Sequence, residues 1–241
     1  MTDLSPGARF ACWFAAYATS RVSLDDALDA ITASDAAHHV VGVDDGTDAT
    51  PLALALGALR GRGADHVHLA LPTAGDPVGL AGPAEFNLEA VDAGEAVLLG
   101  GAGLGLVPSV VGSGVFWRVR RADSPGAWDV AEADRVLRTA LRDTADALAS
   151  LDVARWSPDA ADALLNLRVG GGPDLPPGTD ARAVALASTA CRCLAIVEVA
   201  RRTDGAAVTA YEADQRTAAL RPLDVAARRG LAAACSTPIP R

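Results

Sequence analysis

The stretch ARAVALASTACRCLAIVEVARR, residues Ala181–Arg202, is apolar around nearly its whole circumference when it is drawn as a helix. A helix without a polar face belongs in a protein interior, so we expect the rest of the chain to pack around it. Its length of about 20 residues would also span a bilayer, but Arg192 and Glu198 lie inside it and arginines crowd both ends. The pattern favours a buried helix of a soluble protein, with Leu194 and Ile196 almost fully buried. A buried Glu198 would need an arginine or several hydrogen-bond donors.

The composition restricts the classes of partner. Half of the 241 residues are apolar, so the chain can bury a sizeable core as one large domain or two small ones. The formal net charge of -9 repels phosphate backbones and anionic membranes, and we expect neither a nucleic-acid partner nor a membrane partner. The chain contains no lysine, which excludes a Walker A nucleotide-binding loop and Schiff-base catalysis.

The cysteine pattern and the N-terminal residues predict a cytoplasmic protein. The cysteine spacing does not indicate a disulfide framework, so we predict reduced, buried thiols. Residues 10–18 resemble the apolar core of a signal peptide, but Asp3 precedes them and Arg9 is the only nearby positive charge. The four cysteines are Cys12, Cys191, Cys193 and Cys235.

The first half of the chain predicts a small mixed sheet of five strands. A β-rich run at residues 39–43, a leucine-rich helix at 51–60 and a second β-rich run at 66–71 form a βαβ order. This order predicts two parallel, neighbouring strands with a right-handed crossover. Three further runs, separated by glycine-rich turns, predict an antiparallel meander. These runs are residues 95–99, 104–111 and 115–121.

After residues 122–126 the pattern becomes wholly helical, and we place a domain boundary there. The predicted class is therefore α+β, with a mixed α/β part at residues 1–125 and a helical part at residues 126–241 around the 181–202 helix. The helical part carries more apolar surface than one central helix needs, so we expect a homodimer. Its other helices are expected at residues 129–151, 159–167, 208–219 and 222–235.

Two stretches resemble known catalytic or cofactor-binding motifs, but each lacks a residue that the motif requires. The run VVGVDDGTDAT is similar to the start of the haloacid dehalogenases, but Val43 stands where their nucleophilic aspartate would be, so Asp45 has no partner to assist. The glycines of GGAGLGLVP lack the third glycine of a dinucleotide fingerprint, because Leu106 stands there. No motif indicates a cofactor.

Acidic and turn-forming residues follow both strands of the predicted βαβ unit. Because ligands of parallel sheets bind at the carboxyl ends of strands, we expect a crevice between residues 44–48 and the loop at residues 72–83. Its negative charge favours a small polar or cationic ligand, such as an amine, a polyol or a hydrated divalent ion. Solvated turns are the alternative, because Asp and Gly commonly form turns. The predicted ligand-binding residues are Asp44, Asp45, Thr47, Asp76 and Phe86.

The histidines fall at the starts of the same two strands. If the strands are parallel neighbours, His38, His66 and His68 could meet around a metal ion. This edge lies opposite the carboxyl ends, and hydrogen-bonded structural histidines are the alternative.

Four runs resemble a family of uncharacterised actinobacterial proteins, and the resemblance covers most of the chain. It implies no activity. We therefore expect a soluble protein that binds a ligand or partner without covalent chemistry; the alternative is a metal-dependent or acid/base hydrolase that uses Asp and His residues. The four runs are SPGARFACW (5–13), GDPVGLAGPAEFN (75–87), WSPDAADALLNLR (156–168) and YEADQRTAALRPLD (211–224).

Overall fold

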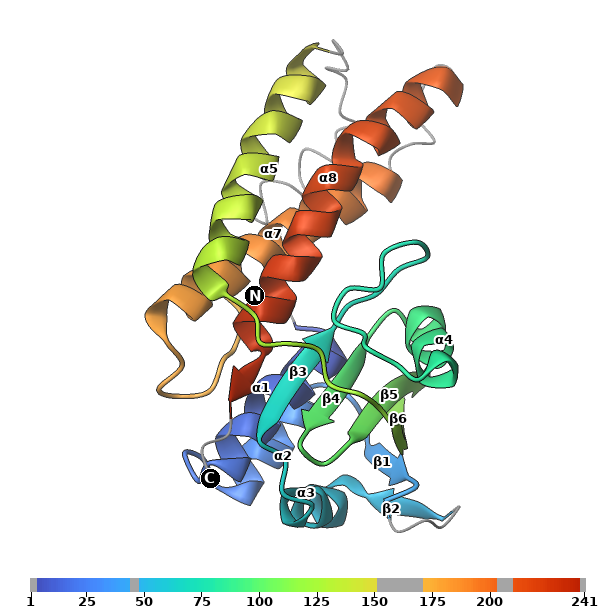
Figure 1. Cartoon of the computed structure of the whole chain (residues 1–241), viewed down its shortest axis with the longest axis vertical. Coiled ribbons are helices and arrows are strands. Elements are labelled where there is room, and N and C mark those ends of the chain that lie inside the picture. Colours follow the sequence, from blue (N-terminus) through green and yellow to red (C-terminus); the bar gives the residue numbers. More distant parts are fainter. Residues whose placement is uncertain (1–3, 44–47, 151–170, 203–209, 239–241) are drawn as a thin grey trace. The chain divides into compact units, whose positions relative to one another are not determined.

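The computed structural model describes residues 4–43, 48–150, 171–202 and 210–238 (Figure 1). The chain forms two compact units. The sheet unit comprises residues 4–128, 174–180 and 232–241, and the helical unit comprises residues 1–3, 129–173 and 181–231. A mixed sheet in the first half of the chain, followed by a helical second half, confirms the predicted α+β class.

Seven strands form one sheet in the order β2-β1-β6-β5-β4-β3-β7. The strands β4, β5 and β6 are antiparallel neighbours, which confirms the predicted meander. The sequence does not predict the edge strands β2 and β7, because runs of three and two residues are too short to show an alternation of apolar and polar side chains. The strands are β1 (His38–Val41), β2 (Ala49–Pro51), β3 (His66–Ala70), β4 (Ala96–Gly100), β5 (Leu104–Val111), β6 (Gly114–Arg121) and β7 (Thr237–Pro238).

The predicted βαβ unit is wrong, because β1 and β3 are not parallel neighbours. The strand β1 pairs in parallel with β6, and β6, β5, β4 and β3 then alternate in direction, so β3 runs opposite to β1. The physical reason lies in β2, which folds back on β1 as an antiparallel strand. The chain therefore enters α3 (Leu52–Gly61) from β2 rather than directly from β1.

Helices α1 (Pro6–Ala18) and α4 (Ala84–Ala93) pack on opposite faces of the sheet. Phe10 of α1 lies against Trp117 of β6, with ring centroids 4.8 Å apart. Trp117 pairs with Pro108 of β5, so the preceding residue Val107 faces the other way, where it packs in a buried cluster with Phe86 of α4. The helix α2 (Leu24–Thr32) begins with a capping box at Ser23 and packs on α1.

Gly105 shows how the glycine-rich run serves the packing of α4. A Cβ atom at this position would lie 2.4 Å from the Phe86 ring. The missing side chain therefore leaves the space that the Phe86 ring fills in the sheet core.

The helix α4 leaves part of its face of the sheet uncovered. The uncovered part, which we call the open strip, consists of the outward residues His39 and Val41 of β1 and Phe116 and Arg118 of β6. The neighbours of these residues along each strand point to the α1 face and are buried, as successive strand residues face opposite sides. The sheet thus offers a rigid, partly apolar surface beside α4.

The helical unit contains α5 (Val130–Ser150), α7 (Ala181–Arg202) and most of α8 (Ala210–Cys235). The helix α8 approaches the other two at Gly230, where an added Cβ atom would lie 3.2 Å from Leu186 and 3.3 Å from Leu137. The sequence predicts a break at Pro222, but α8 continues through this residue. A proline inside a helix removes one backbone hydrogen bond. The predicted helix at residues 159–167 lies outside the described residues.

The expectation that the whole chain packs around α7 is wrong. Leu194 and Ile196 are only half-buried, and Glu198 is exposed. The residues of α7 that pack against its neighbours form one stripe, because helices on part of its circumference cannot cover every face. That stripe includes Leu186, Ala187, Ala190, Cys193 and Val197.

Among the described residues, one helix is long and apolar enough to cross a membrane. It is Ala181–Arg201, and half of its most apolar window is buried inside the protein. A core helix of a soluble protein passes the same test, so this helix is weak evidence for a membrane span. The four cysteines are free and buried, as predicted.

Candidate functional site

The predicted crevice loses its geometric basis, because β1 and β3 run in opposite directions. Their carboxyl ends lie at opposite ends of the sheet, with β6, β5 and β4 between the two strands. Asp44, Asp45 and Thr47 lie outside the described residues. The ligand-binding role of these residues stays a prediction that no longer rests on neighbouring strands.

Asp76 and Phe86, the other two predicted ligand-binding residues, are in different surroundings. The backbone of Asp76 exchanges two hydrogen bonds with Thr73, at 2.9 and 3.0 Å, in a small turn. The loop then packs back on the sheet, since an added Cβ atom on Gly79 would lie 2.9 Å from Cα of Ala70. Phe86 is 2 % exposed and belongs to the sheet core. It is not the wall of an open crevice.

The three histidines proposed as metal ligands do not meet. His66 and His68 lie on β3, on the far side of three strands from His38 on β1. Their rings are nearly parallel, with centroids 5.6 Å apart. His66 pairs with Asp65 at 3.2 Å, whereas Nδ1 of the buried His68 has no hydrogen-bond partner. No group of three His, Cys, Asp or Glu side chains in the described part of the chain could hold a metal ion.

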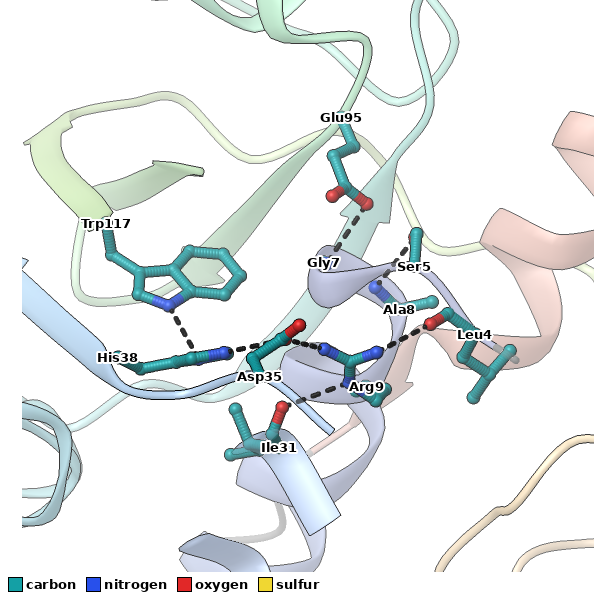
Figure 2. A network of polar contacts seen from close by, with 10 residues as sticks. All are labelled: Leu4, Ser5, Gly7, Ala8, Arg9, Ile31, Asp35, His38, Glu95 and Trp117. Carbon is teal, nitrogen blue, oxygen red and sulfur yellow. Dashed lines mark hydrogen bonds and ion pairs between the residues drawn. The ribbon is translucent and has the colours of Figure 1, made fainter. Parts of the chain in front are cut away.

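His38 belongs to a buried polar network at the start of α1, which Figure 2 shows. The Trp117 indole Nε1–H donates to Nδ1 of His38 at 3.2 Å. Because this nitrogen must accept, Nε2 carries the proton and donates to Asp35 at 3.0 Å. Both ring nitrogens are thus occupied, and burial lowers the pKa of His38. His38 can act neither as a metal ligand nor as a base in this arrangement.

The same network connects α1 to the loop after α2 and to β4 (Figure 2). Arg9 forms an ion pair with Asp35 and donates to the carbonyl oxygens of Ile31 and Leu4, each at 3.0 Å. Glu95 accepts the backbone N–H of Gly7 at 3.0 Å. Burial raises the pKa of Glu95, and hydrogen bonds from Ser5 and Gly7 oppose this rise. These contacts stabilise the fold by fixing α1 to its neighbours.

A hollow of the sheet unit lies between α4 and the open strip. Its volume is about 740 Å³, and we call it the α4 groove. Val41, Val107 and Phe116 provide apolar lining, while Glu89 and Asp92 of α4 provide carboxylates. Phe116 is held in place by stacking on His39, with ring centroids 5.5 Å apart and planes at 21°. This arrangement can hold an apolar group against the sheet and a charged group against the helix.

Three acidic residues line the α4 groove, and the two on α4 have different electrostatic surroundings from the buried Glu95 and from each other. Glu89 is bridged to Arg118 at 3.4 Å and to Arg120 at 3.2 Å. The exposed side chain of Asp92 makes no ion pair or hydrogen bond with any residue that the structure describes. Asp92 therefore provides an exposed carboxylate that has no partner among the described residues.

The local sequence pattern does not predict the α4 groove. A signal is present in β6, where Phe116 and Arg118 alternate with the apolar residues Val115, Trp117 and Val119. An aromatic residue at an outward position of a half-buried strand indicates a surface that contacts something else. The strands that α4 leaves uncovered depend on the order of the strands in the sheet. The local sequence pattern does not predict that order.

Comparisons with known proteins identify relatives but no activity. The model of the Rv1486c-like protein, N-terminal domain, matches residues 7–133, and the model of the C-terminal domain matches residues 131–232. Uncharacterised protein Rv1486c of Mycobacterium tuberculosis (strain ATCC 25618 / H37Rv) is 28% identical over 272 residues, which cover 92% of this chain and 93% of the relative. Uncharacterised protein MT1533 of strain CDC 1551 / Oshkosh matches with the same identity and coverage.

These matches confirm the resemblance to an uncharacterised actinobacterial family. No solved structure matches the chain significantly.

Proposed function

We propose that this chain, which belongs to the Rv1486c-like protein family, is a binding protein that holds a small apolar amine in the α4 groove. The observation that carries the proposal is the combination of an apolar sheet floor with the exposed carboxylate of Asp92. Binding of this kind needs no covalent chemistry.

The size and rigidity of the α4 groove support the binding of a small molecule. A volume of about 740 Å³ falls within the range of about 300 to 1,000 Å³ that is usual for ligand sites. The floor is formed by paired strands, so the apolar contacts are already in place before a ligand binds. Phe116 is 40 % exposed and offers its ring to an apolar group.

The charge of the groove selects the head group of the ligand. Arg118 and Arg120 already donate to Glu89, whereas Asp92 has no partner among the described residues. An ammonium group near Asp92 would gain a charge-assisted hydrogen bond. The groove therefore favours an amine over a carboxylate with the same apolar body.

A hydrolase that uses Asp and His residues is the alternative function. For this reaction we propose His66, whose partly exposed ring pairs with Asp65, whereas His38 has both ring nitrogens occupied. The cytoplasmic location and the homodimer expected from the sequence also stand as proposals. Val110 and Val111, which are 68 % and 59 % exposed at the end of β5 and also line the α4 groove, offer apolar surface for a dimer contact.

Calorimetric titration with three probes of one apolar body tests the proposal. We expect 2-phenylethylamine to bind more tightly than 2-phenylethanol, and 3-phenylpropionate to bind most weakly. Asp92→Asn should weaken binding of the amine about tenfold and leave binding of the alcohol unchanged. Phe116→Ala should weaken binding of both.

Leu54→Ala is the matched control, because Leu54 is equally a large exposed apolar residue of the sheet unit but lies on α3, outside the groove. It should leave all three affinities unchanged. Equal binding of the amine and the carboxylate, or no binding of any probe at millimolar concentration, would refute the proposal.

A further inference from the structure

Arginines of α5 and α7 line a cleft in the helical unit. Its volume is about 530 Å³, and four of its six lining residues are arginines. The chain as a whole carries a net charge of -9, so a local concentration of positive charge opposes the general trend. The lining residues are Ala131, Asp134, Arg135, Arg138, Arg142 and Arg182.

We propose that this arginine cleft binds the polyphosphate group of a small molecule. The site is independent of the α4 groove, since it uses residues of the other unit. A guanidinium group offers parallel N–H donors that match two oxygens of a phosphate, whereas the flexible ammonium group of a lysine lacks this geometry.

The spacing along α5 fits an anion with more than one phosphate. Arg135, Arg138 and Arg142 are separated by three and four residues, which places them on one face of the helix. Arg142 lies seven positions after Arg135, which corresponds to a rise of about 10 Å along the helix axis. Arg182 reaches the same cleft from α7, so an anion would be held from two helices.

Carboxylates fix two of these arginines without neutralising the cleft. Arg138 Nε lies 3.1 and 3.0 Å from the two oxygens of Asp134, and Arg135 pairs with Glu132. Both arginine side chains remain largely exposed, at 72 % for Arg135 and 68 % for Arg138. The remaining N–H groups of each fork can still donate to a ligand.

Arg142 supplies a charge that no neighbour compensates. Its side chain is exposed and has no ion pair with any residue that the structure describes. Arginines gathered on one helix face repel one another, and a bound anion relieves that repulsion. A long nucleic acid would instead meet the negative charge of the rest of the chain, which favours a small ligand.

Calorimetric titration of the full chain with inorganic triphosphate tests this proposal. We expect saturable binding at micromolar to millimolar concentration, and an affinity at least tenfold lower for Arg142→Ala and for Arg138→Ala. Because Arg142 has no partner among the described residues, its substitution should leave the melting temperature unchanged and so separates binding from folding.

The matched control is Arg192→Ala, since Arg192 is an exposed arginine of α7 that does not line the cleft. It should bind triphosphate as the unmodified chain does. Sodium sulfate at equal ionic strength should not compete with triphosphate. Equal competition by sulfate, an equal loss in Arg192→Ala, no measurable binding, or tighter binding of a single-stranded oligonucleotide would each overturn the proposal.

Discussion

The indole nitrogen of Trp117 donates to Nδ1 of His38 at 3.2 Å, and this one contact fixes the tautomer of a fully buried histidine. Protonation of Nδ1 would place its N–H group opposite the indole N–H group of Trp117, and two donors cannot form a hydrogen bond with each other. The ring must therefore stay neutral while the fold is intact.

The first prediction concerns acid stability. Burial lowers the pKa of His38. Burial also lowers the pKa of His68, and electrostatic repulsion from the nearby His66 lowers it further. At acidic pH the unfolded state therefore binds more protons than the folded state. The two histidines contribute stability above the unfolded pKa of about 6.5, and this stability is lost as the pH falls toward the lower pKa values of the folded state. Urea unfolding at pH 8 and pH 5 measures the loss. The double variant with His38→Gln and His68→Gln should lose less stability over this interval; an equal loss would contradict the prediction.

The second prediction concerns Glu95 and has the opposite sign. Burial raises the pKa of Glu95, so its contribution to stability is complete below the unfolded pKa of about 4.5 and is lost as the pH rises through the folded value. Glu95→Gln keeps an oxygen that can accept the Gly7 N–H. Its stability relative to the unmodified chain should therefore rise between pH 4 and pH 8, as followed by urea unfolding. A difference that does not change with pH would be inconsistent with a buried carboxyl group.

The third prediction tests the packing of Phe86 on Gly105. Gly105→Ala should cost about 1 to 3 kcal/mol, because the added Cβ atom would lie 2.4 Å from the Phe86 ring. Thermal unfolding measures the effect. Gly57→Ala is the control: an added Cβ atom on this α3 residue meets nothing within 4 Å, and alanine favours a helix by about 0.5 to 1 kcal/mol. A melting temperature raised by both substitutions would contradict the assigned role of Gly105.

The fourth prediction compares two leucines of α7. Leu186 is fully buried, and Leu186→Ala should cost about 2 to 5 kcal/mol. Leu194 is half-buried, so Leu194→Ala should cost roughly half as much, in proportion to the apolar area removed from water. Guanidinium unfolding measures both values. The reverse order of cost would mean that α7 is rotated relative to the structure described above.

The fifth prediction concerns self-association. Multi-angle light scattering at high micromolar concentration should give twice the chain mass of 24.4 kDa. Val110→Asp places a charge on the exposed end of β5 and should shift the equilibrium toward the single chain. A mass of one chain for the unmodified protein at this concentration would remove the dimer proposal.

Features that depend on near neighbours in the chain were open to prediction. The α+β class and the meander of β4 to β6 follow from turns and periodicity within about ten residues. The free, buried cysteines follow from composition in the same way.

The partner of each strand depended on the tertiary structure. Nothing in the β-rich run of β1 distinguishes β6 from β3 as its neighbour, because the alternation of buried and exposed residues reports only which side chain faces inward. The choice of β6 separated His38 from His66 and moved the open surface from the predicted crevice to Phe116 and Asp92. Likewise the burial of Leu194 depended on which face of α7 meets its neighbours. Local physics decides what a segment becomes, whereas packing between distant segments decides which surface remains for a ligand.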